Sequence, residues 1–172
     1  MNIKQVIVGE LEENCYILSK DNKSLIIDPG DQTDKIIKEI KGEVIGIIIT
    51  HHHFDHIGSL KELLKTYNVP VIDKENKKIL KPYNYQIIEN PGHSKDSISI
   101  YFPNEKIMFC GDFIFAGTIG RTDLPSGDME EMKNSIKNLL TMDEKIILYP
   151  GHYEKTTIKK EKANLEMILK YY

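Results

Sequence analysis

The chain has 172 residues, of which 40% are hydrophobic and 28% are charged, and its formal net charge at pH 7 is −3. This length fits one domain with a real hydrophobic core, so we expect a single domain over residues 1–172. The composition is typical of a globular protein and excludes a disordered chain. The chain has no block of basic residues, which excludes the electrostatic footprint of a nucleic-acid-binding protein. A small-molecule substrate is therefore expected.

The sequence also bears on the compartment. Residues 1–6 begin with strand-like alternation and have no apolar signal segment, and nowhere do about 18 apolar residues run together. Cys15 and Cys110 lie in apolar runs, where a cysteine packs as a small hydrophobic residue. This use of cysteine suits a reducing cytosol. We expect a cytoplasmic protein with no membrane partner, either a monomer or a small homo-oligomer.

The first half of the chain predicts a β-rich segment followed by α/β alternation. Three short apolar runs at residues 3–8, 15–18 and 25–27 predict an antiparallel meander. Isoleucines at helical spacing predict a helix over residues 33–40, and the continuous apolar run 44–49 predicts a strand covered on both faces. Leucines over residues 57–67 predict a second helix, with Asp55 and His56 at its N-terminus.

The second half predicts short strands, one long loop and two helices. The strands are expected at residues 71–72, 85–88, 98–102, 106–109 and 146–149. A segment rich in Gly, Thr, Asp and Pro predicts a loop over residues 111–127. Helices are expected over residues 129–140 and 157–169.

Every histidine of the chain lies at or just beyond the end of a predicted strand. Four of them, His51, His52, His53 and His56, follow the predicted strand at residues 44–49. His93 follows the strand at 85–88, and His152 follows the strand at 146–149. Asp112 likewise follows the strand at 106–109. Because ligands and catalytic groups gather at the carboxyl ends of strands in layered α/β proteins, these loops are predicted to converge on one point.

Imidazole and carboxylate ligands without a nearby cysteine favour an open, catalytic metal site over a closed structural zinc site. Alternate positions of an extended turn point the same way, so His51 and His53 would bind one ion and Asp55 and His56 a second. The predicted set is His51, His53 and His93 on the first ion, Asp55, His56 and His152 on the second, and Asp112 bridging both. Asp55 and Asp112 are the predicted catalytic carboxylates. We expect two divalent ions, zinc first, with iron or manganese as alternatives.

Four neighbouring residues allow two interpretations each. His52 points either to solvent or to a ligand that it supports. Asp28 is either a turn former or a carboxylate that orients a ligating imidazole, as outer carboxylates do at metal sites. Ser94 and Ser97 are turn or cap residues first and supports of His93 second.

The motif Thr-His-His-His-Phe-Asp-His at residues 50–56, with Gly-His at 92–93, Gly-Asp at 111–112 and Gly-His at 151–152, resembles the metallo-β-lactamase superfamily and, within it, the glyoxalase II group. The resemblance implies a four-layer αββα sandwich, in which two mixed β-sheets are flanked by helices and the metal site lies at one edge of the sheets. It also supports the ligand assignment above.

Residues 111–115, 120–125 and 156–164 are similar to short, single-domain glyoxalase II-like hydrolases and to persulfide dioxygenases. Full-length glyoxalase II carries a C-terminal helical domain that helps to hold glutathione. Only residues 153–172 follow His152 here. We therefore expect a single domain without that helical domain, in which the thiol part of a substrate is held differently.

The leading functional hypothesis is hydrolysis of a thioester, such as an S-acylglutathione or a related acyl-thiol, by a metal-bridging hydroxide. A thiol pKa near 8.5 makes the thiolate a leaving group that needs little help from an acid. Arg121 either contacts a substrate carboxylate or forms a salt bridge that holds its loop. The alternatives are a mononuclear-iron persulfide dioxygenase, with Asp112 and two of His51, His53 and His93 as ligands, and a metal-binding domain without catalysis.

Overall fold

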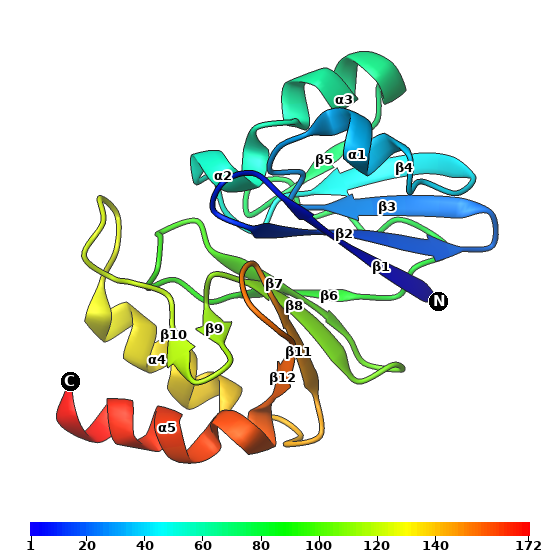
Figure 1. Ribbon diagram of the computed structural model, residues 1–172. Helices are drawn as coiled ribbons and strands as arrows, with labels where there is room; N and C mark the ends of the chain where they lie inside the picture. Colours follow the sequence, from blue (N-terminus) through cyan, green and yellow to red (C-terminus); the bar gives the residue numbers. More distant parts are fainter. The chain divides into compact units, whose positions relative to one another are not determined.

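The structure is a computed structural model that describes residues 1–172. The chain forms two compact units, residues 1–84 and residues 85–172 (Figure 1). That all 172 residues act as one domain stays a prediction. No helix of either unit is long and apolar enough to cross a membrane. Both cysteines are buried, as their apolar neighbours predicted.

The first unit is built on a five-stranded mixed sheet in the order β1-β2-β3-β4-β5. Its strands are β1 (Asn2–Val8), β2 (Glu13–Lys20), β3 (Lys23–Ile27), β4 (Glu43–Ile48) and β5 (Val71–Ile72). β1, β2 and β3 form the predicted antiparallel meander, whereas β3, β4 and β5 are parallel. The parallel strands β3 and β4 end at the same edge, and the backbone N–H of Asp28 donates to the Ile48 carbonyl at 2.9 Å. Asp28 and the histidine motif therefore lie side by side.

Three helices belong to this unit: α1 (Thr33–Ile37), α2 (Phe54–Ile57) and α3 (Leu60–Tyr67). α1 and α3 cover one face of the sheet (Figure 1). Ile36 of α1 and Leu63 of α3 are fully buried there against strand residues that include Ile17, Ile26 and Ile47. Burial of such a side chain contributes about 1.5 to 3 kcal/mol, so this core fixes the sheet from which the motif emerges.

The second unit is built on a sheet in the order β12-β11-β8-β7-β6 and a two-stranded hairpin, β9 with β10. Its strands are β6 (Gln86–Glu89), β7 (Ile98–Phe102), β8 (Ile107–Gly111), β9 (Ile114–Phe115), β10 (Thr118–Ile119), β11 (Ile147–Pro150) and β12 (Thr156–Thr157). Only the β8–β11 pair is parallel. Both strands end together, and the Gly151 N–H donates to the Gly111 carbonyl at 2.9 Å. Asp112 and His152 follow these two glycines directly.

The helices of the second unit are α4 (Met129–Leu139) and α5 (Ile158–Tyr171), which pack on each other (Figure 1). Their buried residues, among them Met132 and Leu165, join Met108 and Leu148 of the sheet in one apolar cluster. The mixed sheets with covering helices match the predicted fold class.

Several predicted boundaries were wrong. The helix expected over residues 33–40 ends at Ile37, and the helix expected over 57–67 is split into α2 and α3. The split has a physical cause, because the Ser59 N–H donates to the Pro29 carbonyl at 3.0 Å instead of continuing a helix. Asp55 and His56 therefore lie inside a one-turn helix.

In the second unit, the hairpin β9–β10 lies within the segment 111–127 that was predicted as an uninterrupted loop. The strand expected at residues 146–149 is not the last one, because β12 follows it. These strands have only two residues each, which is too short for an alternation pattern to reveal.

The N-terminus of α4 offers a test of the fold. The Asp128 carboxylate accepts the backbone N–H groups of Glu130 at 2.8 Å and Glu131 at 3.0 Å, which are otherwise unsatisfied at a helix start. Asp128→Ala is expected to lower the free energy of unfolding by about 1 kcal/mol, and Asp128→Asn, which keeps a capping oxygen, by much less. Urea unfolding followed by circular dichroism measures both. Equal losses in the two variants would contradict the capping role.

Candidate metal centre

Asp28 organises the candidate metal-binding motif of the first unit. Its side-chain oxygens accept the Thr50 backbone N–H at 2.7 Å and the Thr50 hydroxyl at 2.6 Å. The same carboxylate lies 3.1 Å from Nδ1 of His56. Asp28 has a left-handed backbone, with φ of 49°, which turns the chain directly after β3. Asp28 therefore has both of the roles predicted from the sequence: it makes a turn and it orients an imidazole.

The contact with Asp28 sets the tautomer of His56. A carboxylate can only accept a hydrogen bond, so Nδ1 of His56 carries the proton and Nε2 keeps a lone pair. Nε2 lies 3.7 Å from the Asp55 carboxylate, and the His56 side chain is fully buried. This is the arrangement in which a histidine binds a metal through one nitrogen and is held through the other.

Thr50 sets the tautomer of His51 in the same way. Because the Thr50 hydroxyl gives its proton to Asp28, its oxygen is an acceptor toward Nδ1 of His51, 3.2 Å away. Nε2 of His51 is then left with a lone pair. It faces Nδ1 of His53 at 3.1 Å, with the two rings nearly perpendicular at 80°.

The spacing of these two nitrogens fits a metal ion. Zinc–nitrogen bonds of 2.0 to 2.1 Å in tetrahedral geometry hold two ligand nitrogens about 3.3 Å apart, close to the 3.1 Å observed between His51 and His53. His52 points elsewhere, since its Nε2 lies 3.7 Å from the Asp73 carboxylate and nearly half of its side chain is exposed. The predicted alternation of the three histidines is thus what the structure shows.

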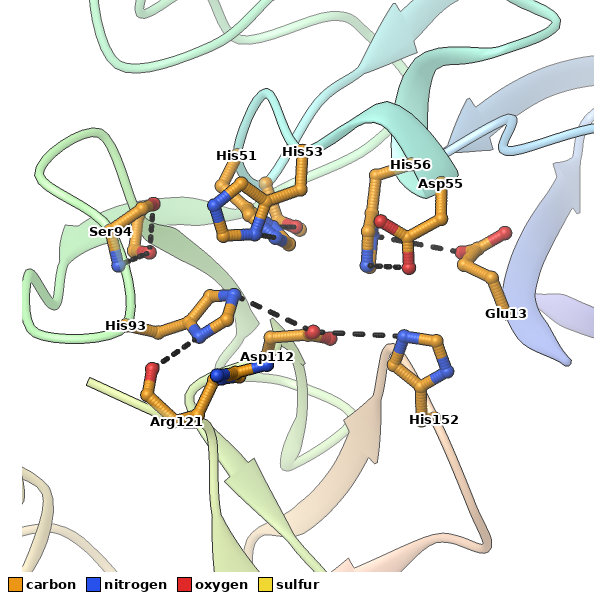
Figure 2. Close-up of polar contacts among 12 residues, drawn as sticks. Glu13, His51, His53, Asp55, His56, His93, Ser94, Asp112, Arg121 and His152 are labelled. Atoms are coloured by element: carbon orange, nitrogen blue, oxygen red, sulfur yellow. Dashed lines mark hydrogen bonds and ion pairs between the residues drawn. The ribbon is translucent and has the colours of Figure 1, made fainter. Parts of the chain in front are cut away.

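The second unit brings together the other predicted ligands. Oδ2 of Asp112 lies 3.6 Å from Nε2 of His93 and 3.6 Å from Nε2 of His152 (Figure 2). One carboxylate oxygen between two imidazole nitrogens is the arrangement expected of a bridging ligand. Ligand atoms on one zinc ion are about 3.4 Å apart, so each of these separations fits a shared ion.

His93 is also held through its second nitrogen. The backbone carbonyl of Arg121 can only accept, so Nδ1 of His93 donates to it at 2.8 Å, and Nε2 keeps its lone pair (Figure 2). Gly120 makes this approach possible. A Cβ atom at this position would lie 1.8 Å from the Asp112 carbonyl oxygen and 3.0 Å from Nδ1 of His93.

Ser94 and Ser97 form a turn beside His93. Their hydroxyls lie 2.8 Å apart, and the Ser94 hydroxyl donates to the Asp96 carboxylate at 2.7 Å. These contacts are those of turn residues, the first of the two roles predicted for the serines.

The Arg121 side chain forms the predicted salt bridge. Nε and Nη2 donate to the two carboxylate oxygens of Asp123 at 2.7 and 2.8 Å. The hydrogen bond from Arg121 lowers the pKa of Asp123 to about 2. Both side chains are exposed, at 61% and 70%. The Arg121 guanidinium therefore lies at the surface, in an ionic contact with Asp123.

Three residues of the site were not singled out in the sequence: Thr50, Gly120 and Glu13. Glu13 begins β2 and is 1% exposed, with its Oε1 3.8 Å from Nδ1 of His56. Thr50 precedes the histidines directly, and a hydroxyl at that position is its only sequence signal. The imidazoles of His51, His56 and His93, each with one nitrogen held by an acceptor, and the carboxylates beside them fit divalent metal ions.

Comparisons with known proteins agree with this geometry. The family model of the metallo-β-lactamase superfamily matches residues 8–86 and 84–152. The hydroxyacylglutathione hydrolase GloC of Haemophilus influenzae is 32% identical, with 95% of this chain and 96% of that protein covered.

Two solved structures are similar over almost their whole length. The crystal structure of the BLEG-1 B3 metallo-β-lactamase has a TM-score of 0.86 at 28% identity and covers 97% of this chain and 99% of its own. The crystal structure of TTHA1623 in a di-iron-bound form has a TM-score of 0.82 at 27% identity, with 92% and 96% covered. The fold and the family predicted from the histidine motif are confirmed, and this chain belongs to the metallo-β-lactamase superfamily.

Proposed function

We propose that the protein is a binuclear metallohydrolase that cleaves a thioester, such as an S-acylglutathione or a related acyl-thiol. The observation that carries the proposal is the Asp112 carboxylate, whose Oδ2 lies 3.6 Å from the Nε2 atoms of both His93 and His152. A bridging carboxylate is needed only where two ions are bound. Membership in a superfamily of metallohydrolases supports hydrolysis as the reaction class.

The proposed ligand set is the one predicted from the sequence: His51, His53 and His93 for the first ion, Asp55, His56 and His152 for the second, and Asp112 for both. Bound divalent ions would supply Lewis acidity and lower the pKa of a nucleophilic water from 15.7 to about 7. Zinc and iron both suit these ligands, and the related TTHA1623 structure is di-iron-bound.

The residues of the chain have separate tasks in this proposal. Asp28 and Thr50 hold His51 and His56 with their metal-binding nitrogens deprotonated. The Arg121 carbonyl does the same for His93. The leaving thiolate needs little protonation because its pKa is near 8.5. We assign to the Arg121 guanidinium a contact with a substrate carboxylate, which would exchange with its exposed pair to Asp123.

The thioester class is supported by the Haemophilus influenzae relative, which is a hydroxyacylglutathione hydrolase. The mononuclear-iron dioxygenase remains the rival, and metal content separates the two. Protein purified without a histidine tag should contain close to two metal ions per chain and should hydrolyse S-lactoylglutathione. One iron per chain, with oxygen uptake on glutathione persulfide, would overturn the proposal.

Two histidines of the motif, His56 and His52, provide a matched pair of variants. His56→Ala is expected to lower metal content toward one ion per chain and to reduce thioester hydrolysis by at least about a hundredfold, since the nucleophile depends on the metal. His52→Ala removes an imidazole that faces Asp73 and should leave metal content and rate unchanged. Metal analysis and thiol release measure both. Full activity in His56→Ala would rule out the binuclear mechanism.

Thr50 offers a test of the supporting hydrogen bonds. Thr50→Val keeps the shape but removes the hydroxyl that joins Asp28 to His51. Loss of an outer partner of a metal ligand typically weakens metal binding 10- to 100-fold, so we expect about tenfold weaker zinc binding in a chelator competition. Thr50→Ser keeps the hydroxyl and should bind zinc within about threefold of the wild type. Equal affinities of the Val and Ser variants would show that the hydroxyl does not act on the metal site.

A further inference from the structure

Glu13 places a second buried carboxylate beside His56. Its Oε1 lies 3.8 Å from Nδ1 of His56 (Figure 2). Oδ2 of Asp28 lies 3.1 Å from the same nitrogen. All three side chains are at most 3% exposed. Ligand-type atoms of the three residues lie within 4.8 Å of one another. The imidazole of His56 thus has two acidic groups behind it.

The chain makes room for Glu13 at a glycine. A Cβ atom on Gly30 would lie 2.6 Å from Oε2 of Glu13 and 1.9 Å from the backbone carbonyl oxygen of Asp55. The segment after β3 therefore packs closely against both the Glu13 side chain and the backbone of Asp55 in α2. This close packing fixes where the Glu13 carboxylate lies.

The carboxylates of Asp28 and Glu13 contact His56 in different ways. Asp28 accepts from Thr50 twice and from His56, so hydrogen bonding alone accounts for its burial. Glu13 lies beyond hydrogen-bond distance from His56, and its effect on the imidazole is one of charge. Burial raises the pKa of the neighbouring Cys15 thiol, and the charges of Glu13 and Asp28 raise it further. The Cys15 thiol stays neutral and adds no negative charge.

We propose that Glu13 is a positioning residue that acts through His56: its negative charge behind the imidazole strengthens the binding of a divalent cation at Nε2. The proposal rests on the binuclear function above, in which His56 is a ligand of the second ion. Removing an outer carboxylate typically costs 10- to 100-fold in metal affinity. The effect should therefore fall on the second ion rather than on the first.

Glu13→Gln tests the charge, because Gln keeps the size and removes only the negative charge. Cobalt(II) is titrated into metal-free protein, and two stepwise affinities are obtained from the visible absorption with a competing chelator. We expect the cobalt ion at the position of Asp55, His56 and His152 to bind about tenfold more weakly in Glu13→Gln. The affinity of the cobalt ion at the position of His51, His53 and His93 should change less than threefold. The matched control is Glu12→Gln, since Glu12 is the exposed neighbour, and it should match the wild type.

Two further variants distinguish positioning from a structural role. In a His56→Ala background, Glu13→Gln should have no additional effect on the remaining cobalt ion, because the group through which it acts is gone. Glu13→Asp keeps the charge and should bind the second ion within about threefold of the wild type. Glu13→Asp also serves if Glu13→Gln does not fold, since a tenfold loss in Glu13→Asp contradicts a role of the charge.

The outcomes for Glu13 and for the proposed function are distinct. A wild-type protein that binds only one cobalt ion contradicts the binuclear function itself. A wild type that binds two ions, together with unchanged second-ion affinity in Glu13→Gln, overturns the role of Glu13 alone. Equal weakening of both ions, or a loss that persists in the His56→Ala background, overturns it as well.

Discussion

The hydrogen bonds of the Asp28 carboxylate are the constraint on which the candidate metal ligands of the first unit depend. A carboxylate accepts and never donates, so every group that faces Asp28 must present a proton to it. His56 does so through Nδ1 and Thr50 through its hydroxyl. Because the Thr50 hydroxyl has donated its proton to Asp28, its oxygen accepts a hydrogen bond from Nδ1 of His51. One buried acid therefore determines which nitrogen remains available on two imidazoles. His93 reaches the same result with the backbone carbonyl of Arg121.

The parallel strand pairs explain how these groups come together within each unit. β3 and β4 end at one edge, which brings Asp28 next to the motif that begins at Thr50, and β8 and β11 end together, which brings Asp112 near His152. Such convergence could be predicted because a strand end followed by a polar side chain is visible in the sequence. The predicted placement of every histidine after a strand depended on this feature, and the motif spacing then identified the family.

The supporting residues could not be predicted in the same way. Thr50 and Glu13 act through contacts with residues that are distant in the sequence, and nothing in their neighbours indicates which way they point. Gly120 is required by the approach of the Asp112 carbonyl, which only three-dimensional packing reveals. The break between α2 and α3 also escaped prediction, because the Pro29 carbonyl that takes the Ser59 N–H lies 30 residues earlier in the chain.

Burial of the acidic residues connects the site with the stability of the protein. A buried charge costs free energy unless it is paired and hydrogen-bonded. Asp28 meets this condition through its three donors, and the Glu13 carboxylate lies 3.8 Å from Nδ1 of His56. A negative charge buried beside an imidazole attracts a cation, since the attraction between charges is stronger where water is excluded. In the role proposed for Glu13, its buried charge becomes favourable when a cation binds to the His56 imidazole.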